Sequence, residues 1–496
     1  MPDQSAHPAS YRDPAGYVFR SGSLYYRQVN ASYAEDYEQL MRSGLYAALT
    51  QQGLLIPHTE IAENLTGAPE WYKTLLPRQV PFISYPSQWS PAQLKDAALL
   101  TLKVLRIAMD HGMILKDATP LNIQFIDGEA VFIDTLSFER YNTAVPWVAY
   151  RQFCECMLFP LYLQHYLSTG THWIMSAWPG GIPAAVTARL LPLKSRLRLG
   201  VWLHVLLQSR IQRIHSSPGE GGRPETTPAT AQARKPENAQ AAGRPPQSGK
   251  PSGPARQPGF SKEKLGRLIG NLERIVGQLK TDDGRLSVWN NYYESTISSP
   301  SYLASKELLF REFIAGLTFG SALDLGANDG YFSRILAAGV TGKQGRVLAV
   351  DGDWQCINRL YETRTKLTSI LPLYIDIANP TPATGFQNRE QSSFLEQASS
   401  DLVAALALLH HLVFGRNIPL PKIAALLSEL TRTYLVIEFI PLEDGKVREL
   451  IQDREHIHLP YNAAVFEAEW AHYFTIGKQA TIAGTQRILY LMKKKS

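Results

Sequence analysis

The N-terminal part of the chain carries short strand-like patterns followed by helical ones. Apolar and polar residues alternate over 17–20 and 23–29 around Ser21-Gly22, which predicts a β-hairpin. Apolar residues at helical spacing predict a helix over about 33–52 and a long helix over about 91–111. Further along, the same reasoning predicts short strands near 71–76 and 80–85 and a buried, aromatic-rich helix over 147–166.

From residue 262 onward, helical and strand-like patterns alternate. Leucine and isoleucine recur at helical spacing over about 262–279, and a second helix is predicted at about 304–316. Apolar runs then predict strands at 321–325, 346–351, 371–376, 401–408 and 434–441. Helices near 446–452 and 464–472 and strands near 473–478 and 485–492 follow. Such alternation predicts an α/β fold with a Rossmann-like open sheet.

A different composition separates these two parts. Residues 216–259 hold nine prolines and seven glycines and almost no apolar side chain, so they cannot bury enough surface to offset the entropy of ordering. We therefore predict a disordered linker over 216–260. It divides the chain into an N-terminal domain over 11–215 and a C-terminal domain over 261–496.

Composition limits the class of protein. With 496 residues, 45% hydrophobic and 19% charged, the chain is long enough for two globular cores. Three cysteines without a Cys-x-x-Cys pattern predict neither a disulfide framework nor a zinc site, so we expect no metal. The N-terminus lacks a secretion-signal pattern, and no run approaches 18 apolar residues. These features favour a cytoplasmic protein.

Positive charge is concentrated in one stretch. The net charge is +6, and residues 181–215 contain six basic side chains and no acidic one. The stretch is also rich in leucine, so it fits peripheral contact with an anionic membrane surface or with a polyanion. It equally fits a core helix with a solvated basic edge. The chain otherwise shows no clear nucleic-acid signal.

The strand at 321–325 runs into a glycine-containing turn and then a helix. Gly326 and Gly330 can take backbone angles closed to other residues, and without a Cβ they let the chain approach a ligand closely. This pattern is typical of a nucleotide-binding turn. The residues predicted to contact a cofactor here are Asp324, Gly326, Ala327, Asn328 and Gly330.

Acidic residues end the next two strands. Asp351 lies 27 residues after Asp324, and a carboxylate at this place can accept hydrogen bonds from both ribose hydroxyls. Ligands of open α/β sheets lie beyond the carboxyl ends of the strands, where Asp376 also falls. The remaining predicted cofactor contacts in these two turns are Gly352, Asp353 and Ile377.

The fourth and fifth strands end in candidate catalytic residues. His410 and His411 follow the fourth strand, and an imidazole suits a general base because it titrates near neutral pH. Glu438, in the fifth strand, is expected to orient that histidine or to bind an acceptor hydroxyl. A structural interpretation stays open, in which the histidines cap a turn and Glu438 is a structural carboxylate.

Residues 287–494 resemble class I S-adenosylmethionine-dependent methyltransferases in the glycine turn and the order of strand-end acids. The resemblance implies a seven-stranded domain in which the turn wraps the amino-acid part of S-adenosyl-L-methionine, Asp351 holds its ribose and Asp376 contacts its adenine. Asn328 replaces the usual third small residue, a variant that these enzymes also use. The Gly-x-Gly-x-x-Gly of dehydrogenases is absent, although a nicotinamide enzyme or a non-catalytic nucleotide-binding fold stays an alternative.

In the N-terminal part, Asp117, Asn122 and Asp134 bracket a predicted hairpin. Their spacing resembles that of the catalytic Asp, the Asn and the metal-binding Asp of protein kinases and aminoglycoside phosphotransferases. The resemblance implies an α+β kinase-like domain. The phosphate-binding lysine and glycine loop are missing, although Arg27 lies roughly where the lysine would be. We therefore expect no phosphotransfer and a docking role for acceptor or partner.

The two parts together resemble bacterial nodulation-protein-like methyltransferases, in segments 25–30, 115–118, 132–139, 323–328 and 437–439. This implies O-methylation of a saccharide or another small-molecule hydroxyl. A protein or RNA methyltransferase is one alternative, although the Asn/Asp-Pro-Pro-Tyr motif of many nitrogen methyltransferases is absent after the fourth strand. A nucleotide-sensing binding module without catalysis is another.

Overall fold

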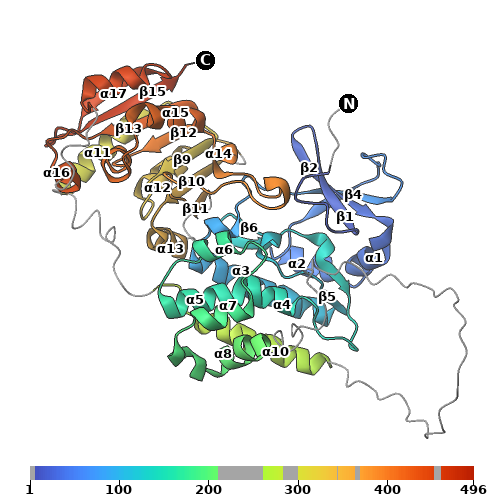
Figure 1. Ribbon diagram of the computed structural model, residues 1–496. Coiled ribbons are helices and arrows are strands. Elements are labelled where there is room, and N and C mark those ends of the chain that lie inside the picture. Colours follow the sequence, from blue (N-terminus) through green and yellow to red (C-terminus); the bar gives the residue numbers. More distant parts are fainter. Residues whose placement is uncertain are drawn as a thin grey trace, which may run out of the picture.

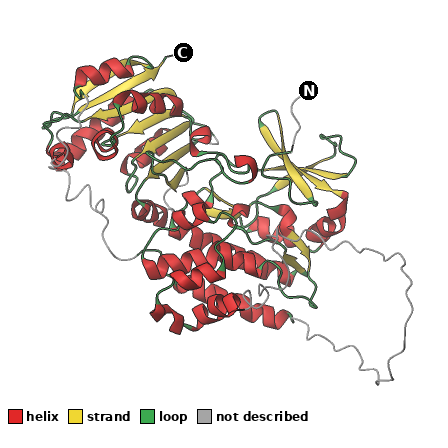
Figure 2. Cartoon of the chain, viewed as in Figure 1, coloured by secondary structure: helices red, strands yellow, loops and turns green. Residues whose placement is uncertain are grey.

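The computed structural model describes residues 6–210, 261–282, 300–342, 345–363, 369–451 and 460–495. The predicted linker at 216–260 lies outside the described residues. Figure 1 shows an N-terminal part, coloured blue to green, beside a C-terminal part, coloured gold to red. Figure 2 shows that the larger sheets of the two parts are separate groups of strands above a layer of helices.

The N-terminal part begins with a four-stranded antiparallel sheet in the order β1-β2-β4-β3. Its strands are β1 (Gly16–Ser21), β2 (Leu24–Asn30), β3 (His58–Ile61) and β4 (Trp71–Pro77). The predicted hairpin is confirmed, because Ser21 pairs with Leu24. The predicted strand over 80–85 is wrong, because no described residue there belongs to a strand.

The helix predicted over 33–52 is also wrong in part, since the structure has α1 (Ala34–Arg42) and α2 (Leu45–Gln51). Gly44 separates them with a φ of 78°, which a right-handed helix cannot continue through. The long helix is confirmed as α3 (Pro91–Asp110). It starts where it does because the Ser90 hydroxyl accepts a hydrogen bond from the Gln93 amide.

Small sheets and short helices complete the N-terminal part. The hairpin of β6 (Ile123–Ile126) and β7 (Glu129–Phe132) turns through Asp127 and Gly128, both with positive φ. The other elements are β5 (Met113–Leu115), β8 (Phe138–Arg140), α4 (Tyr150–Phe153), a π-helical turn (Cys154–Leu158), α5 (Phe159–Leu167), α6 (His172–Ala177), α7 (Ala184–Leu190), a 3-10 turn (Leu193–Leu197), α8 (Leu199–Val201) and a π-helical turn (Trp202–Leu206).

The C-terminal part confirms the predicted seven-stranded sheet, with strand order β11-β10-β9-β12-β13-β15-β14. Its strands are β9 (Ser321–Leu325), β10 (Arg346–Asp351), β11 (Ile370–Tyr374), β12 (Ser400–Ala405), β13 (Thr431–Phe439), β14 (Phe474–Thr481) and β15 (Ile488–Lys494). The first five are parallel neighbours, and β15 runs antiparallel to β13 and β14. The helices are α11 (Pro300–Ile314), α12 (Tyr331–Gly339), α13 (Trp354–Glu362), α14 (Phe394–Gln397), α15 (Leu420–Leu430), α16 (Gly445–Ile451) and α17 (Ala463–Trp470).

Side chains alternate between the two faces of this sheet. Ala322 belongs to the hydrophobic cluster beneath α11 and α12, whereas its neighbour Leu323 belongs to the cluster beneath α15 and α17. Both faces are therefore covered, as expected for a mainly parallel sheet. The carboxyl-end edge stays available for the glycine turn and the strand-end acids.

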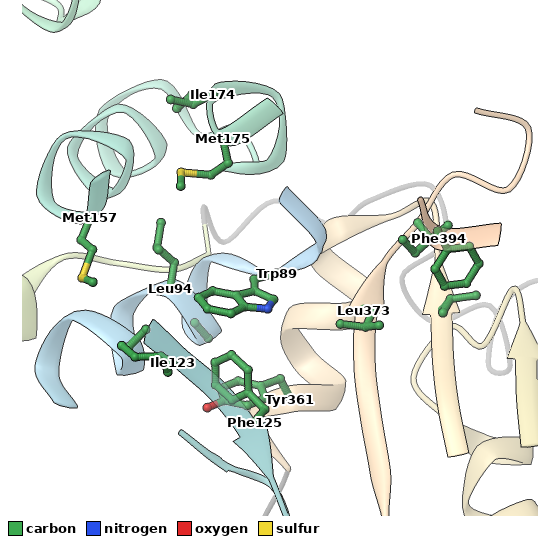
Figure 3. Close-up of a cluster of buried hydrophobic side chains, with 14 of the residues drawn as sticks. Trp89, Leu94, Ile123, Phe125, Met157, Ile174, Met175, Tyr361, Leu373 and Phe394 are labelled. Carbon is green, nitrogen blue, oxygen red and sulfur yellow. The ribbon is translucent and has the colours of Figure 1, made fainter. Parts of the chain in front are cut away.

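The hydrophobic cluster beneath α15 and α17 continues into the N-terminal part. In Figure 3, Trp89 and Phe125 of the N-terminal part lie beside Tyr361 and Leu373 of the C-terminal part. The ring centroids of Phe125 and Tyr361 are 5.5 Å apart in an edge-to-face arrangement. The two parts thus share one continuous hydrophobic core.

Helix α10 (Lys262–Gln278) confirms the helix predicted over 262–279 and lies among the helices of the N-terminal part (Figure 1). Arg106 of α3 forms an ion pair with Glu273, and the Lys95 ammonium donates to the Leu279 carbonyl oxygen at 2.7 Å. The boundary at 261 stays a prediction, but this helix packs on α3.

Candidate functional site

The glycine turn after β9 is fixed against the neighbouring strand β10. The backbone amides of Gly326 and Ala327 both donate to the Val350 carbonyl oxygen, at 2.9 and 3.0 Å. Gly326, Asn328 and Gly330 have φ of 75°, 51° and 79°, so three positions of this turn are left-handed. Asparagine tolerates this conformation better than most residues, which explains Asn328 at the second position.

The two glycines have different roles. A Cβ on Gly326 would lie 3.6 Å from the Leu408 Cδ1 atom, an ordinary contact distance, so packing does not require this glycine. A Cβ on Gly330 would lie 2.6 Å from the Leu360 Cδ1 atom, so this glycine is required by packing between α12 and α13. Both have the left-handed backbone that other residues rarely adopt.

Asp351, at the end of β10, lies directly beside this turn. Its carboxylate accepts hydrogen bonds from the backbone amides of Asn328, at 2.9 Å, and Asp353, at 2.8 Å. Burial raises the pKa of Asp351 to about 6, more than these two hydrogen bonds lower it. The arrangement joins the turns after β9 and β10 through one half-buried carboxylate.

Asp324 is more deeply placed than the cofactor role predicted for it suggests. It is buried within β9, and its carboxylate accepts a hydrogen bond from the Ser333 hydroxyl at 2.6 Å. Burial raises its pKa to about 6. The contact links β9 to α12 and so supports the turn between them.

Asp329 was not singled out by the sequence, although it lies inside the glycine turn. Its Oδ1 atom is buried and has no hydrogen-bond partner in the described part of the chain. Burying an acceptor atom without a donor costs about 1–3 kcal/mol, so a buried unpartnered oxygen usually accepts a hydrogen bond from a ligand or water. The only sequence signal was its position between Asn328 and Gly330.

The residues after β11 form the far end of the carboxyl-end edge of the sheet. The Asp376 carboxylate pairs with the Arg416 guanidinium at 2.7 Å and accepts from the Ala378 amide at 3.0 Å. Ile377 is buried, and a Cβ on Gly352 would lie 3.6 Å from the Asp376 Cα atom. The turns after β10 and β11 are therefore in direct contact.

The two histidines after β12 differ in exposure. His410 is buried with an unpartnered Nδ1 atom, whereas His411 is half-buried, and their ring centroids are 4.0 Å apart. Burial lowers the pKa of His410 well below its usual value and that of His411 to about 4. Both imidazoles are therefore neutral at neutral pH, the form that can accept a proton.

Glu438 is fully buried and surrounded by donors. Its carboxylate accepts from the Lys306 ammonium at 2.6 Å, the Tyr302 hydroxyl at 2.6 Å and the Ala407 amide at 2.9 Å. Burial alone would raise the pKa of Glu438, but Lys306 and Arg487 outweigh it and hold that pKa below its usual value. In this arrangement the carboxylate has no exposed surface for an acceptor.

The cations around Glu438 come from distant parts of the chain. Lys306 is in α11, and Arg487 precedes β15, where its guanidinium also binds Asp444 at 2.8 Å. Ala407, held by Glu438, has a left-handed φ of 50°, which is unusual for alanine. Glu438 thus shapes the turn that carries His410 and His411.

Two of the three polar residues predicted in the N-terminal part, Asp134 and Asn122, belong to one hydrogen-bonded cluster that includes a basic side chain. Arg27 pairs with Asp134 at 2.5 Å, and the Ser137 hydroxyl bridges Asp134 and Asn122 at 2.6 and 3.0 Å. Burial, followed by the charge of Asp134, raises the pKa of Asp117. The described residues contain no group of three or more side chains arranged to hold a metal ion.

Comparison with known proteins gives one relative along nearly the whole chain. No protein-family model matches. The nodulation protein NoeA of Rhizobium meliloti (strain 1021) is 28% identical over 494 residues, which cover 98% of this chain and 95% of that protein. Both parts of the chain are therefore present together in this relative.

Solved structures resemble a smaller part. N-methyltransferase NodS from Bradyrhizobium japonicum WM9, in complex with S-adenosyl-L-homocysteine, aligns with 42% of this chain and 94% of its own, at 14% identity and a TM-score of 0.31. An rRNA methylase from Escherichia coli aligns with 39% of this chain and 65% of its own, at 18% identity and a TM-score of 0.28. Among the described residues, no helix is both long and apolar enough to cross a bilayer.

Proposed function

We propose that the chain is an S-adenosyl-L-methionine-dependent methyltransferase. The observation that carries this proposal is the contact between Asp351 and the glycine turn, at the carboxyl ends of β9 and β10. The strand order reverses between β9 and β12, and ligands of doubly wound sheets bind at such a switch point. The antiparallel β15 agrees with the sheet expected from the resemblance to class I methyltransferases.

The residues at this edge fit the cofactor. Asp351 provides a carboxylate for the ribose hydroxyls, and the unpartnered Asp329 Oδ1 atom suits the ammonium of the methionine part. Asp376, held by Arg416, and the buried Ile377 are assigned to the adenine side. When bound, the cofactor supplies a methyl group made electrophilic by its sulfonium.

The chain's own task is then to orient an acceptor hydroxyl and to remove its proton. We assign the general base to His411, because it is half-buried and neutral, whereas His410 is too buried to touch an acceptor. His410 positions His411 through their ring contact. Glu438 positions both through Ala407 and does not itself contact the acceptor.

The proposal of a saccharide as methyl acceptor rests on the named relative rather than on the site itself. The relative along the whole chain is named a nodulation protein, which agrees with the saccharide expected from the sequence resemblance. We therefore propose O-methylation of a saccharide hydroxyl. The N-terminal part would dock that acceptor, since its polar cluster is closed by the Arg27 and Asp134 pair rather than open for a metal ion.

The test uses the full chain and S-adenosyl-L-homocysteine in calorimetry. We expect one binding site, which Asp329→Asn weakens by about tenfold or more without lowering the melting temperature, because the replaced oxygen has no partner. Asp401→Asn is the matched control, because that carboxylate accepts from the Gly320 and Ser321 amides at the opposite end of β9. A wild-type chain that binds no S-adenosyl-L-homocysteine would overturn the cofactor assignment.

A transfer assay separates the acceptor classes. Cofactor labelled in its methyl group, incubated with fractionated cell extract, should label the saccharide fraction. His411→Ala should slow this labelling by about a hundredfold or more while cofactor affinity stays unchanged. Label in protein or RNA would contradict the saccharide, and magnesium-dependent ATP turnover lost in Asp117→Ala would contradict an inactive N-terminal part.

A further inference from the structure

We propose that the edge of the molecule formed by residues 189–203 binds the surface of anionic membranes. The apolar-basic patch on this edge consists of Leu193, Lys194, Leu197, Arg198, Leu199 and Trp202. All six side chains are exposed, and Leu193, Leu197 and Leu199 are 74, 89 and 72% exposed. Figure 1 shows α7, which precedes the patch, and α8, which contains Leu199, in the lower part of the view, away from β12–β15.

Exposed leucines at this density are exceptional in this chain. Among the described residues, fifteen large apolar side chains are exposed, and six of them fall within residues 190–203. Single exposed leucines need no explanation, but a group of them marks a site of interaction. The apolar side chains are therefore displayed for a partner.

The inner face of this segment is anchored in the core at its C-terminal end, beside Leu199 and Trp202. His204 is buried and bonds the Tyr150 hydroxyl at 2.6 Å and the Asn271 side chain at 3.0 Å. A Cβ on Gly200 would lie 2.7 Å from the Tyr162 hydroxyl, which shows how closely α8 packs on α5. One face is thus fixed in the core and the opposite face is presented outward.

The charge of the patch selects the partner. Lys194 and Arg198 alternate with the exposed leucines, Arg189 is exposed beside them, and residues 181–210 contain no acidic side chain. In a symmetric dimer through this edge, a second copy of this chain would place its own basic patch against this one. Anionic lipid instead offers negative headgroups to the basic side chains and an acyl boundary to the leucines.

The test is co-sedimentation of the full chain with vesicles of phosphatidylcholine and phosphatidylglycerol in a roughly three-to-one ratio. We expect binding that weakens with salt and is much weaker on vesicles of phosphatidylcholine alone. Leu197→Ser with Leu199→Ser should weaken it by at least about tenfold. Lys194→Ser with Arg198→Ser should weaken it by about 25-fold, since each basic side chain near the surface contributes about fivefold.

Leu308→Ser, at an exposed leucine of α11, and Lys103→Ser, at an exposed lysine of α3, are the matched controls and should bind as the wild type does. Circular dichroism and S-adenosyl-L-homocysteine affinity check that all variants are folded. The proposal is overturned if the wild type does not sediment with anionic vesicles or if both vesicle types bind it equally. It is also overturned if the patch variants abolish dimerisation or RNA binding while vesicle binding is unchanged.

Discussion

At the scale of single residues, the ribose role proposed for Asp351 would connect cofactor binding to pH. The folded-state pKa of Asp351 is raised to about 6 from an ordinary value of 3.8, so the folded chain keeps the proton over a range where the unfolded chain has lost it. The free energy of unfolding should therefore fall as pH rises from about 4 to about 6. Ribose hydroxyls need the ionised carboxylate as acceptor, so cofactor affinity should rise over the same range.

The measurement is S-adenosyl-L-homocysteine affinity between about pH 5 and 7, where we expect an increase approaching tenfold per pH unit below the pKa. Asp351→Asn should bind weakly and lose most of this dependence. Asp324 also has a pKa of about 6 but bonds Ser333, so Asp324→Asn should keep the dependence of affinity on pH. An affinity that does not change with pH in the wild type would contradict the ribose role of Asp351.

Glu438 gives a second prediction, on stability. Glu438→Gln leaves the Lys306 ammonium buried without a counter-charge, which should lower the free energy of unfolding by about 3–5 kcal/mol in urea denaturation. Adding Lys306→Met should recover most of that loss. Glu449→Gln, which breaks the surface pair with Lys446, should cost less than about 1 kcal/mol. If Glu438→Gln and Glu449→Gln lowered the free energy of unfolding equally, the buried pair would stabilise the fold no more than a surface pair does.

Sequence could identify some of these residues and not others. The position of Asp351 and Gly326 at one edge was predictable, because Asp351 ends an apolar strand, Gly326 follows one, and parallel strands bring their carboxyl ends together. Lys306 and Arg487 were not, because they meet Glu438 only after α11 and β15 pack against the sheet. No local pattern distinguishes such a lysine or arginine from a surface one.

At the scale of elements, the N-terminus of α3 is completed by a helix of the other part. The Ala92 amide, in the first turn of α3, donates to the Asn358 Oδ1 atom of α13 at 2.8 Å. The Gln93 side chain donates to the Pro372 carbonyl oxygen of β11 at 3.1 Å. Strand β11 is at the edge of the sheet, where proline is tolerated and where unpaired groups need covering.

Asn358→Ala should therefore destabilise the contact between the two parts. The Ala92 amide would stay buried without an acceptor, which costs about 1–3 kcal/mol. Urea denaturation measures the loss, and limited proteolysis near α3 should become faster. Thr281→Ala, which removes an exposed hydrogen bond to Glu362, should change neither. If Asn358→Ala were as stable as the wild type, the interface would be only a loose contact.

Element types were easier to predict than their ends and partners. Apolar runs predicted the five parallel strands of the C-terminal sheet, since buried parallel strands are nearly continuous apolar runs. The two strands predicted near 473–478 and 485–492 correspond to the antiparallel β14 and β15. The break at Gly44 was missed because the apolar spacing of α1 continues into α2 in the sequence. The docking of α10 on α3 was missed because amphipathic spacing shows that a helix has a buried face and not which helix covers it.

At the scale of the whole molecule, the shared core argues that the two parts unfold together. The cluster around Trp89 and Tyr361 belongs to both parts (Figure 3). Helix α10 packs on α3 although it follows the predicted linker. Multidomain chains often unfold in steps, but only where domain contacts are weak. A continuous apolar core makes a single cooperative unit the expectation for this chain.

Hydrogen exchange with and without S-adenosyl-L-homocysteine tests that expectation. A ligand that binds only the folded state stabilises the whole cooperative unit, by about 2.7 kcal/mol at a hundred times its dissociation constant. The slowest amides of α3, in the N-terminal part, should therefore gain the same protection as those of β9, which adjoins the glycine turn. In Asn358→Ala the gain in α3 should shrink while the gain in β9 is kept. Protection confined to β9 in the wild type would mean that the two parts unfold independently and that their shared core does not couple them.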